Sequence, residues 1–154
     1  MIMKVKNNNI INKDYLYMGI DFGSKKIGFA IGQLITAKSS PLGIVINKNN
    51  QVNWADIQHL VEKWKPNVII VGYPYALKKN KFLESLDNFI KDLTYMYKDS
   101  IQVSVFSEVL STEETKELYA NIRKSDYNIS KKDNLDDLSA SIILESWFNE
   151  NMIS

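Results

Sequence analysis

The sequence predicts an α/β fold, in which a mixed five-stranded sheet carries helices on both faces. Stretches of alternating apolar residues come first in the chain, as in a meander of antiparallel strands. Apolar residues at helical spacing then separate further strand-like stretches, as in βαβ crossovers. The 154 residues, of which 45% are hydrophobic, match one domain of ordinary size.

A predicted β-hairpin opens the domain. Residues 15–21 alternate and are rich in aromatic and β-branched side chains, and after a turn the alternation resumes over residues 27–32. A third strand is expected within residues 36–47, bent near Pro41 and Gly43. One face of the second strand carries only small residues, namely Gly28, Ala30 and Gly32.

The apolar period then changes to that of a helix over residues 54–64, with Asn53 as N-cap and Pro66 beyond its end. The continuous apolar run 68–71 is typical of a strand covered on both faces. The remaining predicted elements are a helix over 82–93, a strand over 101–106, a helix from the capping box 111–114 towards Arg123, and a last helix from about Asn134 or Leu135 to Asn149.

Composition excludes several kinds of site. The absence of cysteine rules out disulfides, zinc–thiolate sites and cysteine nucleophiles, and it fits a reducing compartment. The apolar runs are too short to cross a bilayer. Residues 1–13 lack the apolar region of a secretory signal, and we expect them to form a flexible extension before a domain at 14–150. These features favour a cytoplasmic protein without membrane contact.

Lysines form local clusters although the net charge is only +1. Each cluster is explained equally by a solvated loop, and the clusters gain meaning only if the fold brings them to one face. Arg123 is the only arginine. The clusters are Lys25 with Lys26, Lys78 with Lys79 and Lys81, and Lys131 with Lys132.

Three acidic residues occupy positions that suit a metal site. Asp21 ends the first strand, Glu108 follows the strand 101–106, and Asp136 lies in the first turn of the last helix. In a mixed sheet of this order, strand ends and a helix start can meet in one cleft. Three carboxylates there would offer the hard oxygen ligands that Mg²⁺ or Mn²⁺ prefers. Two such ions can activate a water and stabilise the leaving oxygen of a phosphodiester.

Each acid also has a purely structural explanation. Asp21 precedes a turn in which aspartate is common, and Glu108 could be a surface acid in a loop. Asp136 could be an acid that the helix dipole favours in a first turn. His59 lies off the apolar stripe of its predicted helix, and we expect it at the surface.

Helical geometry distinguishes Asp136 from its neighbour Asp137. Asp136 heads an apolar stripe that must face the sheet, formed by Ala140, Ile143, Leu144 and Trp147. Asp137 heads the more polar stripe of Ser141 and Glu145, so we expect Asp136 to point inward and Asp137 outward. Asp137 remains an alternative ligand.

Four segments in order resemble the YqgF/RuvX family, whose members are described as pre-16S ribosomal RNA nucleases and as Holliday junction resolvases. They cover nearly all of the chain after residue 14. The segments are 19–33 (GIDFGSKKIGFAIGQ), 65–74 (KPNVIIVGYP), 107–115 (SEVLSTEET) and 135–148 (LDDLSASIILESWF).

The resemblance implies a ribonuclease H-like fold and assigns both catalysis and metal binding to Asp21, Glu108 and Asp136. It implies Mg²⁺ or Mn²⁺ as cofactor, with a two-ion site suspected. It further implies a nucleic-acid substrate, with RNA favoured over DNA, a role in 5′-end processing of pre-16S ribosomal RNA, and a pre-ribosomal particle as a candidate partner.

The chain departs from the family pattern at two places. The family usually has Asp-Glu-Arg where this chain reads Ser107-Glu108-Val109, so the arginine beside the glutamate is missing. The family segment Asn-Met-Asp-Gly-Thr is replaced here by residues 75–80, which read YALKKN. The lysines of this segment would contact phosphates as point charges, without the bidentate fork of arginine.

Function therefore has one leading interpretation and several alternatives. The leading one is a metal-dependent phosphodiesterase in which basic residues position the nucleic-acid backbone. The alternatives are a junction-resolving DNA endonuclease, a non-catalytic RNA- or ribosome-binding module, and a nucleotide-binding protein of the actin-like ATPase type, for which one domain is too short. The expected backbone-binding residues are Lys25, Lys26, Lys78, Lys79, Lys81 and Arg123.

Overall fold

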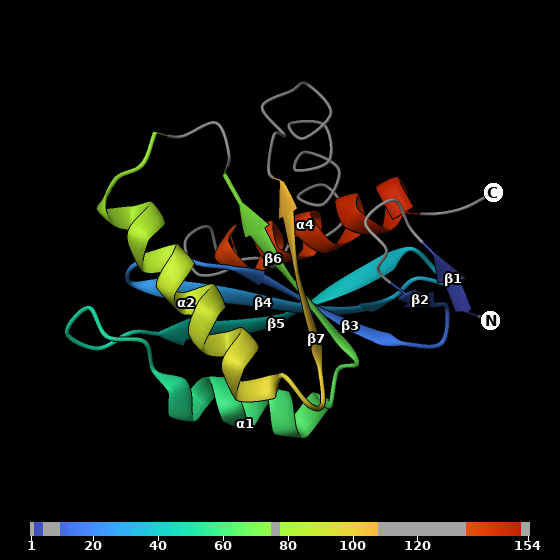
Figure 1. Cartoon of the computed structure of the whole chain (residues 1–154), viewed down its shortest axis with the longest axis horizontal. Coiled ribbons are helices and arrows are strands. Elements are labelled where there is room, and N and C mark those ends of the chain that lie inside the picture. Colours follow the sequence, from blue (N-terminus) through green and yellow to red (C-terminus); the bar gives the residue numbers. More distant parts are fainter. Residues whose placement is uncertain (1, 5–9, 75–77, 108–134, 152–154) are drawn as a thin grey trace.

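A mixed five-stranded sheet lies at the centre of the computed structural model, which describes residues 2–4, 10–74, 78–107 and 135–151 (Figure 1). The strands run in the order β5-β4-β3-β6-β7. β3 pairs antiparallel with β4 and β4 antiparallel with β5, whereas β3, β6 and β7 are parallel to one another. The strands are β3 (Leu16–Asp21), β4 (Lys26–Gln33), β5 (Lys38–Ile46), β6 (Val68–Tyr73) and β7 (Gln102–Ser107).

The bend predicted in the third strand is present. The register of β5 against β4 shifts between Phe29, which pairs with Gly43, and Ala30, which pairs with Pro41. One residue of β5, Leu42, is therefore unpaired, as in a β-bulge. Gly43 has a φ of +140°, a backbone conformation that side chains disfavour, which explains a glycine beside the bulge.

Two helices cover one face of the sheet. α1 (Trp54–Trp64) begins at Asn53, whose side chain accepts a hydrogen bond from the Asp56 amide, and ends at Lys65 in the left-handed conformation. α2 (Lys81–Tyr97) begins at Asn80, whose side chain accepts from the Leu83 amide. Their apolar stripes pack against the same face of the sheet; the buried helix residues are Ile57, Val61, Leu83, Leu86, Phe89 and Leu93.

Helix α4 (Leu135–Asn151) covers the opposite face and contacts β3, β4, β5 and β6. Alternation along β3 divides the two cores. Met18 and Ile20 face α1 and α2, whereas Tyr17 packs against α4, with ring centroids 5.0 Å from Trp147 and 5.4 Å from Phe148. The predicted mixed sheet with helices on both faces is confirmed. The predicted helix over 111–123 lies outside the described residues.

A short strand pair precedes the main sheet. β1 (Ile2–Lys4) and β2 (Ile10–Asn12) pair antiparallel within the segment predicted to be a flexible extension. The Tyr17 hydroxyl donates a hydrogen bond to the Asn12 carbonyl at 3.1 Å, so the end of β2 is tied to β3. Burial raises the pKa of Tyr17 to about 12, so the hydroxyl remains a donor even in alkaline solution. The flexibility of residues 1–13 stays a prediction.

In the described part of the chain, none of the helices is both long enough and apolar enough to cross a membrane.

Candidate functional site

The carboxyl ends of three parallel strands meet at one edge of the sheet. Ile20 of β3 pairs with Val71 of β6, and Val71 pairs with Val105 of β7. β3 ends one residue beyond this row, at Asp21, and β6 and β7 each end two residues beyond it. Asp21 therefore lies at the edge where the chain leaves all three strands, which is where α/β sheets commonly bind ligands.

Asp21 is half-buried on the face that α4 covers, because it alternates with Gly19 and Tyr17 along β3. Its partner across the antiparallel pair is Gly28 of β4. Neither Gly19 nor Gly28 has a side chain, so the neighbours of Asp21 along β3 and across β4 on this face are small. The small-residue face that the sequence predicted on β4 is the face turned towards α4, since Ala30 belongs to the core formed with that helix.

Helix α4 lies against the backbone of β3. A Cβ atom at Gly19 would lie 2.8 Å from the carbonyl oxygen of Ala140 and 3.0 Å from Cβ of Leu144. Since Tyr17 contacts the later residues Trp147 and Phe148, the helix runs antiparallel to β3. The first turn of α4 therefore lies towards the end of β3 that carries Asp21.

The same geometry relates two of the predicted acidic positions. Asp136 is one helical turn before Ala140, about 6 Å along α4. Asp21 is two residues after Gly19, about 6.6 Å along β3. Because Gly19 touches Ala140 and the elements run in opposite directions, these equal steps bring the backbone positions 21 and 136 towards each other.

Asp137 was expected to point outward because it heads a polar stripe with Ser141 and Glu145. That expectation is wrong for Ser141 and Glu145, the two residues of the stripe whose side chains are described. Ser141 is 2% exposed, and a Glu145 carboxylate oxygen accepts hydrogen bonds from the hydroxyl and amide of Ser39 on β5, at 2.7 and 3.2 Å. The Ser39 hydroxyl is also 3.2 Å from the Ser141 carbonyl oxygen. This stripe faces β5 rather than solvent, because α4 is covered on more than one side.

Several predicted site residues fall outside the described part. Among the residues outside the described part are Glu108, Val109, Arg123, Lys131 and Lys132. Residues 136 and 137 are described in their helix but not in their side chains. Among the described residues, no three histidine, aspartate or glutamate side chains gather to hold a metal ion. His59 is exposed, as expected.

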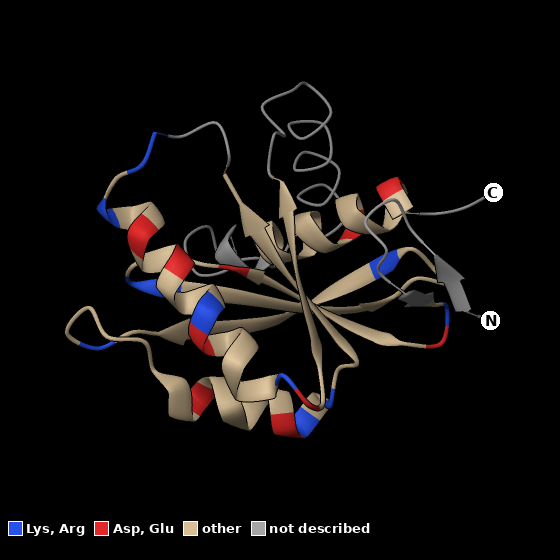
Figure 2. Ribbon diagram, in the orientation of Figure 1, with Lys and Arg blue, Asp and Glu red and all other residues tan. Residues whose placement is uncertain are grey.

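Two of the lysine clusters lie at the same end of the molecule. The exposed Lys25 ends the turn after β3 and the partly exposed Lys26 begins β4, whereas Lys78, Lys79 and Lys81 are exposed where the chain enters α2 (Figure 2). A cavity of about 490 Å³ lies between the two segments, since Ser24, next to Lys25, and Lys81 both line it. That these lysines bind nucleic acid stays a prediction.

Two polar contacts near this edge were not predicted. Asn47 donates hydrogen bonds from Nδ2 to the carbonyls of Gly23 and Ser24, at 3.3 and 3.0 Å, and so holds the turn that follows Asp21. The Tyr73 hydroxyl donates to the Asp87 carboxylate at 2.7 Å, which ties the end of β6 to α2. An asparagine directly after a predicted strand is a signal for the first contact; the second joins residues 14 positions apart and has no local signal.

Comparison with known proteins gives matches over most of the chain. A family model described as RuvX, Holliday junction resolvase, matches residues 15–150. A protein of Buchnera aphidicola subsp. Baizongia pistaciae named "Putative pre-16S rRNA nuclease" is 38% identical over 135 residues, which are 86% of this chain and 96% of that protein. A protein of the same name from Blochmanniella floridana is 38% identical over 144 residues, 92% of this chain and 99% of that protein.

Two solved structures share the fold at low sequence identity. Thermus thermophilus RuvC in complex with a Holliday junction substrate has a TM-score of 0.63 and 14% identity, covering 87% of this chain and 93% of that one. The Fowlpox virus resolvase in complex with Holliday junction DNA has a TM-score of 0.57 and 15% identity, covering 87% and 97%. The similarity confirms the ribonuclease H-like fold.

Proposed function

The chain belongs to the RuvX family, and on this premise we propose that it is a metal-dependent nuclease that hydrolyses phosphodiester bonds of precursor ribosomal RNA. Its catalytic residues in this proposal are Asp21, Glu108 and Asp136. The observation that carries the proposal is the close contact of Gly19 with Ala140, because it directs the first turn of α4 towards Asp21 at the carboxyl edge of the sheet.

Glu108 is included among the proposed catalytic residues because of the alternation of side chains along β7. Phe106 of β7 packs in the core formed with α4, on the same face of the sheet as Asp21. Glu108 is two residues further and directly follows the end of β7 at Ser107. The alternation of the sequence therefore predicts that Glu108 shares the face of Phe106, which is also the face of Asp21.

The donor set fits a divalent cation. Carboxylate oxygens are hard ligands, which suit Mg²⁺ and Mn²⁺. The neighbours of Asp21 on its own face along β3 and across β4, Gly19 and Gly28, are the smallest residues and leave room on these two strands. When bound, the metal ions would supply an activated water and charge stabilisation for the leaving oxygen. In the proposal, Asp21 and Asp136 would hold them from β3 and α4, and Glu108 from the end of β7.

The lysines would position the substrate. Lys25 ends the turn that Asn47 holds and Lys26 begins β4, so their backbone positions relative to Asp21 are fixed by the turn and the strand pair. Lys81 adds a positive charge from the start of α2. Contacts between lysines and phosphates fix the register of a nucleic acid without reading its sequence.

We favour ribosomal RNA because two relatives at 38% identity, each matched over almost its whole length, are named for pre-16S rRNA. This substrate would place the protein in the cytoplasm, with pre-ribosomal particles as partners. A DNA junction is the second candidate, because the family model carries the description Holliday junction resolvase. A family match over residues 15–150 also favours a nuclease over the nucleotide-binding ATPase.

The test of the proposed function is cleavage of matched substrates by the full chain with Mg²⁺ or Mn²⁺. The substrates are a precursor 16S RNA 5′ segment, an RNA duplex, a DNA duplex and a DNA four-way junction. We expect metal-dependent cleavage of the precursor RNA above all others. Preferential cleavage of the junction would establish the second candidate, and binding without cleavage under every condition would instead identify a non-catalytic module.

A double substitution of Lys25 and Lys26 by glutamine should weaken binding of every nucleic-acid sequence alike and lower the salt dependence of binding. Each lost phosphate contact reduces the slope of log K against log salt by roughly 0.7 to 0.9. The measurement is the dissociation constant at several salt concentrations. Lys63, exposed on α1, and Lys98, after the end of α2, provide a matched double control that should leave both quantities unchanged. Loss of affinity for one sequence alone would instead indicate base readout.

A further inference from the structure

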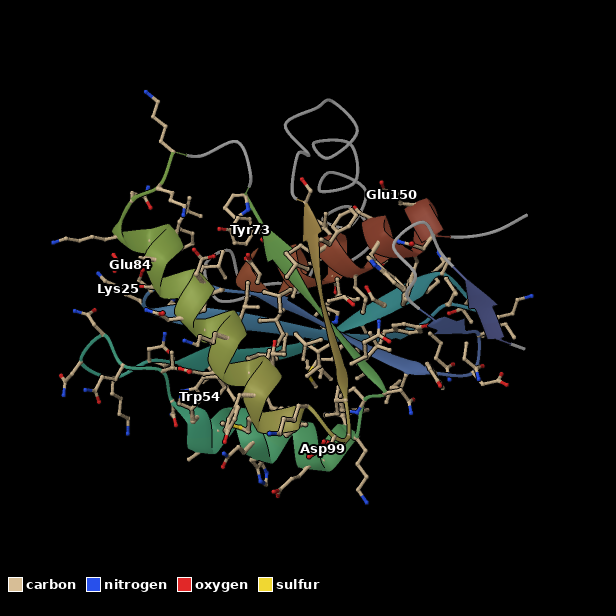
Figure 3. The ribbon with its side chains drawn as sticks, viewed as in Figure 1. Lys25, Trp54, Tyr73, Glu84, Asp99 and Glu150 are labelled. Atoms are coloured by element: carbon tan, nitrogen blue, oxygen red, sulfur yellow. The ribbon has the colours of Figure 1, made fainter. Side chains whose placement is uncertain are left out.

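We propose that the cavity beside α2 is a subsite for an unpaired nucleotide of the substrate strand, an inference that rests on the proposed function. The cavity measures about 490 Å³, is open to solvent on one side and is lined by three segments. These are the turn after β3, which contributes Ser24, the segment after β5, which contributes Asn50, and the first half of α2, which contributes Ser85. In Figure 3, Lys25 and Glu84 lie on this side of the molecule.

Aromatic rings form one wall of the cavity. Phe22 is 7% exposed, with its ring centroid 4.8 Å from that of Phe89 and 6.0 Å from that of Phe82. Trp54 stacks on Phe89 from behind, at 5.2 Å and an interplanar angle of 15°. Phe82 is the more exposed of the three phenylalanine rings. The Phe82 ring packs against Phe22, and because it is partly exposed it offers a surface on which a flat π system can stack.

The remaining lining is polar and suits the edges of a base. Asn50, Ser85 and Asn88 are exposed side chains that both donate and accept hydrogen bonds. The Asp92 carboxylate accepts them, as the exocyclic amino groups of bases require. The Lys81 ammonium offers a charge for a phosphate. One partly exposed aromatic ring, an amide-rich rim and one lysine together fit a nucleotide better than a purely apolar ligand.

The cavity lies next to the proposed catalytic carboxylate but on the other side of the sheet. Consecutive residues of a strand point to opposite faces, so Asp21 faces α4 while Phe22 packs in the core formed with α2. A strand that crosses the carboxyl edge could therefore place a phosphate at Asp21 and a nearby base in the cavity. A paired and stacked base cannot enter such a pocket, so the subsite selects an unpaired nucleotide.

The test compares binding of two RNA hairpins in EDTA, so that no cleavage occurs. Both hairpins have the same stem and the same short structured loop; one has a blunt stem end, and the other carries a short unpaired extension on both its 5′ and 3′ ends. The wild-type chain should bind the extended hairpin at least about 5-fold more tightly, as expected for stacking of one base on an aromatic ring. Phe82→Leu, which keeps an apolar side chain and removes the ring, should abolish that preference.

A second variant and a matched control show whether a loss of the preference comes from the cavity or from misfolding. Ser85 is exposed, so Ser85→Trp should fill the cavity without disturbing the core, and it should also abolish the preference. Tyr95→Leu removes a 73% exposed aromatic ring from the other end of α2 and should leave the preference intact. Thermal unfolding of all three variants verifies the fold.

The outcomes separate this inference from the proposed function. A wild-type chain without preference for the extended hairpin, or a preference that survives both Phe82→Leu and Ser85→Trp, would overturn the subsite while cleavage of precursor RNA still stands. Binding of free nucleoside monophosphate without preference for the extended hairpin would also overturn it, since the occupant would then be a free nucleotide. A chain that binds neither hairpin and cleaves no substrate would contradict the proposed function itself.

Discussion

Asp21→Asn should lower the cleavage rate by at least about 100-fold while the protein stays folded. The exchange removes the negative charge and keeps the size of the side chain, so metal binding is lost and packing is not. Changes to groups that merely orient metal ligands already cost 10- to 100-fold. The measurement is the single-turnover rate at saturating metal, together with the circular dichroism spectrum.

The control for this variant is Asp99→Asn. Asp99 is exposed in the turn between α2 and β7, at the opposite end of β7 from the candidate site (Figure 3). The Asp99→Asn variant should keep the wild-type cleavage rate. A rate for Asp21→Asn within a factor of about two of the wild type would remove Asp21 from the site.

Exchange of the carboxylate for an amide at the other acidic positions tests which of them belong to the site. Glu108→Gln and Asp136→Asn should each match the loss of Asp21→Asn. Asp137→Asn should be much milder, because position 136 is the one that lies a full turn before Ala140, the residue in contact with Gly19. An equal loss at Asp137 would show that the neighbouring acid is the ligand.

Gly19→Ala should destabilise the fold by about 1–3 kcal/mol, the usual range for overpacking. In an open strand, exchange of glycine for alanine would stabilise by about 0.4–1 kcal/mol. Here the added Cβ would lie 2.8 Å from the Ala140 carbonyl oxygen and 3.0 Å from Cβ of Leu144. Both are parts of α4 that no rotamer change can move, so the helix must shift, and the unfavourable contact outweighs the gain.

Urea denaturation measures this effect as a lower midpoint at an unchanged slope. Ser40→Ala, at an exposed position of β5, is the matched control and should change the stability by less than about 0.5 kcal/mol. Since a shift of α4 also moves its first turn relative to Asp21, Gly19→Ala should lose activity under conditions in which it is still folded. Unchanged stability would contradict the close contact of α4 with β3.

The local patterns of the sequence predicted most of the fold. The alternation over residues 15–32 predicts β3 and β4, and the apolar run at 68–71 predicts the central parallel strand β6. These predictions succeed because burial on one face or on both leaves a direct signature in the order of side chains. The place of Asp21 at the end of β3 was predicted for the same reason, since an acid at the end of an apolar strand interrupts that signature, while its role in a metal site stays a prediction.

Contacts between distant segments could not be predicted. The stripe of Ser141 and Glu145 was expected to face solvent, because a polar stripe on a helix usually does. It faces β5 instead, and the hydrogen bonds that satisfy Glu145 come from Ser39, 106 residues away. The cavity beside α2 is likewise invisible in the sequence, because its lining comes from three separate segments.

The central claim is that Asp21, Glu108 and Asp136 form one metal site, and calorimetric titration of the full chain with Mn²⁺ tests it most directly. We expect the wild type to bind Mn²⁺ in the absence of nucleic acid, and each of Asp21→Asn, Glu108→Gln and Asp136→Asn to weaken binding by at least about 10-fold. Asp99→Asn should bind as the wild type does. Wild-type affinity in all three variants, or no Mn²⁺ binding by the wild-type chain, would contradict the claim.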